Sequence, residues 1–429
     1  MTISILLFAV CILSLLQSGI FKRDFFAPLN VYIFSQALSL GIAYLKLMPQ
    51  MSDFQTTTWL VVIGSAISFA AGVFTVRLIW AARHPHEAID RSAPSRTLLA
   101  EANRGYRWWL HALMLIFAFL YLGVGLWAEW KEIGTLILFS PNINRLMTIE
   151  GMPSLGWFVF PLNSGPLVAM LAAPGAFSSL NPHRKLRWFF RISFLLGLFL
   201  GFAGMPNRIS IFSAALVMLY TFNLAARRIR PGFIVFGLLL SLVAFMAVAG
   251  TKGQSVGVSR VMFQKEVLKL PYSYIANNWW NLDYAINRPV DQPEHTRLYG
   301  LDMLHGVMMP NPTFGSLYSA FKWDGIFNET AAKVPRLNSI TYHWSLYKDF
   351  GLIGAVGFPF LFGFLFNYLY LKSKTRGRIF DLSLYTYFLF WVTLWFFEEF
   401  WSNGLYISWL FFIAFTTLIS KPPRNKEVN

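Results

Sequence analysis

Eleven long apolar runs restrict what this chain of 429 residues can fold into. Hydrophobic residues make up 56% of the sequence and charged residues 13%, well below the roughly 25% charged residues of an ordinary soluble domain. Each run is close to the ~20 residues that an α-helix needs to cross a bilayer. Each must be helical, because backbone polar groups in lipid have to bond within their own segment. The sequence therefore predicts an all-α polytopic integral membrane protein with about eleven transmembrane helices, over residues 2–20, 25–47, 58–81, 108–129, 155–178, 188–204, 209–225, 233–250, 350–371, 380–397 and 403–420.

Lysine and arginine residues cluster in every second connection between these runs. Basic residues close to span ends stay in the cytoplasm during insertion, so this alternation predicts an N-terminus outside and a C-terminus inside. The same distribution accounts for the net charge of +16 and the pI of 9.9, and we therefore expect no nucleic-acid partner. The residues that mark the cytoplasmic side are Lys22, Arg23, Arg83, Arg91, Arg96, Arg104, Arg107, Arg184, Lys185, Arg187, Arg227, Arg228, Arg230, Lys372, Lys374, Arg376, Arg378, Lys421, Arg424 and Lys426.

The first apolar run has a second interpretation, as a cleaved signal peptide. No basic residue precedes this run, and Lys22 and Arg23 follow it, so its charges match a membrane span better than a signal peptide. The single cysteine, Cys11, lies inside the run and excludes an intramolecular disulfide. We therefore expect packing and the membrane helices to hold the parts outside the bilayer together.

A long polar segment between the eighth and ninth runs divides the chain into three parts. Residues 1–250 carry helices 1–8 with short loops, and residues 348–429 carry helices 9–11 and a basic cytoplasmic tail. Residues 251–347 form one long loop outside, which in a bacterium would be a periplasmic loop. Within the loop, residues 255–269 have the pattern of an interfacial amphipathic helix. Residues 272–284 mix aromatic residues with amides, and exposed rings such as those of Trp279 and Trp280 would stack on sugars. An aromatic belt at the membrane interface would have the same composition.

The short turn 204–208 places Arg208 at the outer membrane surface. A guanidinium near hydrocarbon is unfavourable unless it meets an anion, and its planar fork suits phosphate oxygens. The alternative is an arginine that reaches out to the lipid headgroups.

The first outer loop, residues 48–57, offers only Asp53 as an acid. A metal-bound acidic site is therefore disfavoured, and we expect neither a metal nor a cofactor.

The stretch from Asn338 to Gly354 reads Asn-Ser-Ile-Thr-Tyr-His-Trp-Ser-Leu-Tyr-Lys-Asp-Phe-Gly-Leu-Ile-Gly and leads into the ninth run. With the number of runs, the short arginine turn and the long loop before the last three runs, it resembles bacterial oligosaccharide repeat unit polymerases, the Wzy-type O-antigen polymerases. The resemblance implies a multi-pass protein of the bacterial inner membrane that acts as a glycosyltransferase without a metal or nucleotide. Such a protein moves a growing glycan from undecaprenyl diphosphate to another lipid-linked oligosaccharide repeat unit. The resemblance also implies a polysaccharide chain-length regulator as a partner in the same lipid bilayer.

The departing diphosphate in such a transfer needs cations around it. By the resemblance, Arg208 matches the arginine that contacts this diphosphate. Arg297 and Arg336 are the first candidates for a second contact, and Arg260 and Arg288 come after them.

The acceptor hydroxyl in such a transfer needs a base near it. His343, just before the ninth run, fits a general base or a residue that orients the acceptor, with a satisfied interfacial histidine as the alternative. Asp349 fits the same role, although its place at the start of a span also suits a helix cap. The other substrate contacts expected in this region are Asn338, Tyr342, Trp279 and Trp280.

Two other functions are compatible with the sequence. An O-antigen ligase would join a finished glycan to a lipid core by closely related chemistry. A transporter of polysaccharides or small molecules would need polar residues at mid-membrane. Here Glu398 and Glu399 lie near an outer span end, whereas Asp381 and His111 lie near inner ends. The sequence therefore favours chemistry or binding at the outer leaflet.

Overall fold

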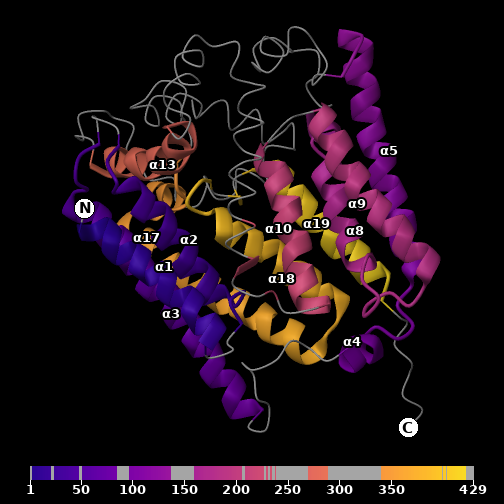
Figure 1. Ribbon diagram of the computed structural model, residues 1–429, viewed down its shortest axis with the longest axis horizontal. Helices are drawn as coiled ribbons and strands as arrows, with labels where there is room; N and C mark the ends of the chain where they lie inside the picture. Colours follow the sequence, from indigo (N-terminus) through magenta and orange to yellow (C-terminus); the bar gives the residue numbers. More distant parts are fainter. Residues whose placement is uncertain are drawn as a thin grey trace.

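All regular secondary structure in the described residues of the computed structural model is helical (Figure 1). The structure describes residues 2–20, 24–47, 51–84, 96–136, 159–204, 208–226, 229, 232–233, 237, 269–287, 340–398, 400–401 and 403–421. The helices are α1 (Thr2–Ile20), α2 (Pro28–Ala43), α3 (Thr56–Arg83), α4 (Arg96–Ala102), α5 (Trp108–Ile133), α7 (Val159–Leu162), α8 (Gly165–Gly175), α9 (Arg184–Gly204), α10 (Arg208–Ala225), α13 (Lys269–Asn287), α17 (His343–Arg376), α18 (Ile379–Leu394) and α19 (Gly404–Ile419).

Every predicted apolar run except the eighth coincides with helix in the structure. Helices α3, α5, α9 and α17 contain stretches long and apolar enough to cross a membrane, and α1, α10, α18 and α19 contain shorter apolar stretches. Large apolar side chains point outward from the long helices; Leu78 is 72% exposed, Leu120 60% and Leu195 65%, as expected of surfaces that lipid covers. The chain is therefore an all-helical, membrane-embedded protein. The total of eleven spans and their orientation stay predictions, because residues 233–250 lie mostly outside the described residues.

Helices α3 and α17 lie side by side and touch at their backbones (Figure 1). A Cβ atom added at Gly72 of α3 would lie 2.1 Å from the carbonyl oxygen of Phe360, and one at Gly363 of α17 would lie 2.2 Å from the carbonyl oxygen of Phe69. Small residues permit this close approach, which helix pairs in membranes use to gain van der Waals contact. Helices α8 and α9 meet in the same way at Gly165 and Gly201.

The predicted span over residues 155–178 is not one continuous helix, so that expectation is wrong. It contains α7 and α8, separated at Asn163 and Ser164. The backbone N–H of Ser164 donates to the carbonyl oxygen of Pro161 at 3.0 Å and its hydroxyl to the same oxygen at 2.6 Å, which closes a turn after α7. Pro166 is the second residue of α8, in the first turn, where proline is favoured because its missing N–H has no partner within the helix. Every residue of α8 is buried.

Helix α17 starts before the predicted span and bends within it. Gly351 has φ 65° and ψ −153°, a conformation that is open only to glycine. The bend separates residues 343–350, which carry the first turns of the helix, from the long apolar part that ends at Arg376. The first turns can therefore point in a different direction from the membrane span.

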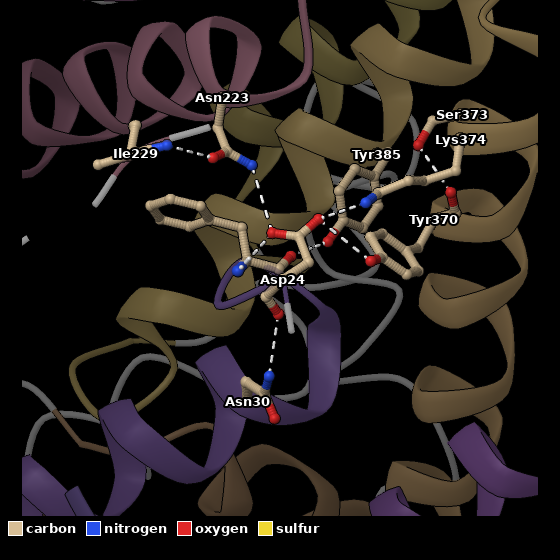
Figure 2. Close-up of polar contacts among 9 residues, drawn as sticks. Asp24, Asn30, Asn223, Ile229, Tyr370, Ser373, Lys374 and Tyr385 are labelled. Carbon is tan, nitrogen blue, oxygen red and sulfur yellow. Dashed lines mark hydrogen bonds and ion pairs between the residues drawn. The ribbon is translucent and has the colours of Figure 1, made fainter. Parts of the chain in front are cut away.

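A buried ion pair joins three parts of the fold at the end of the molecule that the sequence assigns to the cytoplasm (Figure 2). Asp24, between α1 and α2, is 7% exposed, and its Oδ2 atom lies 2.8 Å from Nζ of Lys374 in α17. The same oxygen accepts from the Tyr370 hydroxyl at 3.1 Å, whereas Oδ1 accepts from the backbone N–H of Phe26 at 3.1 Å and from Nδ2 of Asn223 in α10 at 3.3 Å. Burial alone would raise the pKa of the Asp24 carboxyl, but the charge of Lys374 and these hydrogen bonds lower it below its usual value.

Candidate functional site

His343 is the first residue of α17 and is only 1% exposed. Its Nε2 atom lies 2.8 Å from the hydroxyl oxygen of Ser65 in α3, and its Nδ1 atom lies 3.1 Å from the hydroxyl oxygen of Thr341. The Ser65 hydroxyl also bonds to the carbonyl oxygen of Val62 at 2.9 Å, where it must be the donor. Ser65 therefore accepts from Nε2–H, and Nδ1 accepts from Thr341. This network assigns a neutral imidazole protonated at Nε2.

Two tyrosine hydroxyls extend this network toward α2. The hydroxyl of Tyr32 lies 3.3 Å from that of Ser65 and 2.9 Å from that of Tyr342. The ring of Tyr342 stacks on Trp395 with a centroid distance of 4.5 Å, and its backbone N–H donates to the carbonyl oxygen of Trp395 at 3.0 Å. The predicted residues Tyr342 and His343 are thus brought together in a polar network that connects α2, α3 and α17.

Helix α13 packs across α2, α3 and the start of α17 (Figure 1). Trp279 is fully buried; its ring centroid lies 5.7 Å from that of His343, and its indole N–H donates to the Ser39 hydroxyl at 3.1 Å. Trp280 is 4% exposed. The expectation that these two rings present exposed faces is wrong, because they fill the space between α13 and the helices below it.

Asp283 attaches α13 to the beginning of α3. Its Oδ1 atom accepts from the backbone N–H of Gln55 at 2.9 Å and from the hydroxyl of Thr58 at 2.6 Å. The residue is 7% exposed, and Asn287 donates to the same oxygen at 3.2 Å. These contacts hold α13 over the polar network. They could not be predicted from the sequence, because Gln55 and Thr58 lie far from α13 in the chain.

The connection between α18 and α19 lies against the start of α17 and carries an acid to which the sequence assigned no role. Glu398 is partly exposed, and Nδ2 of Asn403 donates to its Oε1 atom at 3.4 Å. Burial raises the pKa of the Glu398 carboxyl to about 7, an effect that this hydrogen bond opposes. The signal in the sequence was a pair of acids, Glu398 and Glu399, within an aromatic run at an outer span end.

Asp349 is fully buried and lies within α17, directly before the bend at Gly351. It is not the first residue of the helix, which begins at His343. The contact of Asp349 with a substrate stays a prediction.

The turn that carries Arg208 lies between α9 and α10, and Arg208 is the first residue of α10. Its side chain is outside the described part of the structure. The other predicted site residues Arg260, Arg288, Arg297, Arg336 and Asn338 lie outside the described residues, as does most of the predicted amphipathic helix over residues 255–269.

A buried acid lies beside this turn. The predicted span over residues 108–129 ends at Glu129, but α5 continues through Ile133 and is followed by Gly134, which has a left-handed conformation. Glu129 is fully buried, and its Oε2 atom lies 3.2 Å from the position that a Cβ atom would take at Gly204. The end of α9 therefore packs against a carboxyl group just before the chain turns toward Arg208.

No protein-family model matches this sequence. No curated protein and no solved structure is similar enough to it to indicate a relationship. The fold and the site therefore define the class only broadly, as an all-helical membrane-embedded protein with a buried polar network at the start of α17.

Proposed function

We propose that this protein polymerises undecaprenyl-diphosphate-linked oligosaccharide repeat units into O-antigen or a similar surface polysaccharide, at the periplasmic face of the bacterial inner membrane. The observation that supports this proposal most directly is the arrangement of the segment from Ile340 to Gly354. His343 in this segment is the first residue of α17 and lies in a polar network. The helix bends at Phe350 and Gly351, before the long apolar part of the helix. Residues that resemble a polymerase motif thus form one structural unit.

The proposed reaction is a transfer of the donor glycan from a diphosphate to a sugar hydroxyl. The leaving diphosphate requires positive charge, which Arg208 would supply with one of the arginines of the long loop. The position of Arg208 at the first residue of α10 adds the partial positive charge of a helix N-terminus. Neither a metal nor a nucleotide is required by this scheme.

The geometry around His343 favours an orienting role over proton transfer. Both ring nitrogens are engaged by protein hydroxyls, and the side chain is 1% exposed. A general base must reach the proton that it removes. We therefore assign His343 to holding Ser65, Thr341 and the start of α17 in place for the acceptor.

The test is the surface polysaccharide ladder on a gel, in a strain that lacks this gene. The strain is complemented with wild type, Arg208→Ala or His343→Ala at matched amounts of membrane protein. We expect wild type to restore long chains and each variant to leave a single repeat unit on the lipid core. Arg184→Ala and His183→Ala are the controls, because both side chains are exposed at the opposite end of α9 from the Arg208 turn, and these variants should restore the full ladder.

The same gel, together with an assay of which side of the membrane holds the lipid-linked units, separates the proposed function from its alternatives. A deletion strain with no glycan attached to the lipid core points to a ligase. A deletion strain whose lipid-linked units accumulate on the cytoplasmic side points to a transporter. An unchanged ladder in the deletion strain refutes all three functions.

A further inference from the structure

A transfer to a sugar hydroxyl requires a group that accepts the hydroxyl proton, and the acids near the start of α17 differ in their freedom to do so. Asp349 is fully buried, and Asp283 is 7% exposed with three donors on one oxygen. His343 has both nitrogens in hydrogen bonds. Glu398 is partly exposed and has one long hydrogen bond, from Asn403.

The connection that carries Glu398 is fixed to both sides of His343. On one side, the carbonyl oxygen of Trp395 accepts from the backbone N–H of Tyr342 at 3.0 Å. On the other side, the indole N–H of Trp401 donates to the hydroxyl of Ser345 at 3.2 Å. Glu398 lies between these two anchor points in the chain, so the connection that carries it is held against the start of α17.

The surroundings of Glu398 keep its carboxyl close to half-ionised at neutral pH. Burial raises its pKa to about 7, and the hydrogen bond from Asn403 opposes this rise. A base works best when its pKa is near the working pH. The titratable and charged groups on the elements packed against this connection, in the same half of the molecule, are Tyr32, Tyr342, His343, Tyr347, Lys348, Asp349, Tyr387 and Tyr406.

We propose that Glu398 accepts the proton of the acceptor hydroxyl during glycan transfer, an inference that rests on the function proposed above. The acceptor oxygen forms a bond to the anomeric carbon of the donor. The bond from that carbon to the diphosphate oxygen breaks, and its electron pair leaves with undecaprenyl diphosphate. The hydroxyl proton passes to the Glu398 carboxylate and then to water, which restores the carboxylate.

The experiment measures chain elongation in membranes from the deletion strain that contain wild type, Glu398→Gln, Glu398→Asp or Asp53→Asn. The substrate is the lipid-linked repeat unit extracted from the deletion strain itself. Rates per amount of folded protein are measured between about pH 5.5 and pH 9. We expect the wild-type rate to rise with pH through about 7 and then level off.

The variants test Glu398 separately from the rest of the site. Glu398→Gln should be slower by about 100-fold or more and should lose the rise with pH. Asp53→Asn also removes one acid, but the side chain of Asp53 is 75% exposed and paired with Lys46, so this variant should keep the wild-type profile. Glu398→Asp should shift the rise to lower pH by about half a unit, because aspartate is the stronger acid.

The outcomes separate the two proposals. If wild type elongates chains and Glu398→Gln keeps both the rate and the pH profile, Glu398 is not the proton acceptor and the proposed function stands. If Glu398→Gln does not fold, an unshifted profile in Glu398→Asp overturns the role of Glu398. If wild-type membranes do not elongate the lipid-linked unit, the proposed function itself is refuted.

Discussion

The buried pair of Asp24 and Lys374 offers the sharpest test of how this fold is held together. Lys374→Met removes the charge and keeps most of the volume, so it leaves the Asp24 carboxylate with three neutral donors at 7% exposure. Removing one partner of a buried pair typically lowers stability by about 3–5 kcal/mol. The Asp24 carboxyl can lose this unpaired charge by taking up a proton, which at pH 7 costs about 4 kcal/mol for a group of ordinary pKa ~3.9. We therefore expect Lys374→Met to lose about 3–4 kcal/mol at neutral pH.

The double variant Asp24→Asn, Lys374→Met should recover most of this loss, because it removes both buried charges. The pH dependence has a definite sign. The lowered pKa of Asp24 makes the pair stabilising above the unfolded value of ~3.9, and this contribution is lost as the pH falls through the folded value. That loss lies below about pH 4. Between pH 7 and pH 4 the gap between wild type and Lys374→Met should narrow for a second reason, because the Asp24 carboxyl of the variant takes up a proton at less cost as the pH falls.

Cys11 supplies the assay for this comparison. It is the single cysteine and is 5% exposed, so a thiol-reactive fluorophore reports unfolding of the detergent-solubilised protein. Lys372→Met is the matched control, since Lys372 is two residues away on α17 and partly exposed over the Tyr368 ring; we expect less than about 1 kcal/mol from it. Equal melting temperatures for Lys374→Met and Lys372→Met, or a double variant no better than Lys374→Met, would refute the reasoning.

Three further predictions concern the packing of helices α3 and α17, the polar network around His343, and Glu398. Gly363→Val should prevent stable folding, because its Cβ would lie 2.2 Å from a backbone oxygen. A Cβ at Gly357 would meet nothing within 4 Å, so Gly357→Val should leave the melting temperature nearly unchanged. Ser65→Ala removes the acceptor for Nε2–H of His343 and should slow elongation about tenfold without moving the pH profile. Because burial raises the pKa of Glu398 to about 7, its ionised form destabilises the fold at higher pH. The free energy of unfolding of Glu398→Gln should therefore exceed that of wild type at pH 8, by at most about 3 kcal/mol, and should equal it below pH 4.5.

The helices were predictable because lipid imposes one length and one composition on each span. The interruptions were not, because they depend on single residues within apolar sequence. The break at Ser164 occurs between two prolines, Pro161 and Pro166, which is a signal that the hydropathy of residues 155–178 conceals. The bend at Gly351 is harder to predict, since the chain has 30 glycines and only four of those that the structure describes have a positive φ.

The site was predicted only in the part that lies within one continuous segment. Tyr342 and His343 were identified from their motif, but their partners Ser65 and Tyr32 come from α3 and α2, and no spacing in the sequence relates them. Lys374 illustrates the same limit. It was counted as one of many basic residues that mark the cytoplasmic side, yet it is 7% exposed and bonded to an acid 350 residues earlier in the chain.

A buried histidine can be essential to the proposed transfer without exchanging a proton. His343 fixes Ser65 and Thr341, and the residues beside it, Tyr342 and Ser345, receive the two anchors of the connection that holds Glu398. Loss of the imidazole would therefore disturb the position of the carboxyl through both anchors. Under the proposed mechanism, the motif at the start of α17 determines geometry and the connection between α18 and α19 supplies the titratable group. The two anchors join these parts although they are far apart in sequence.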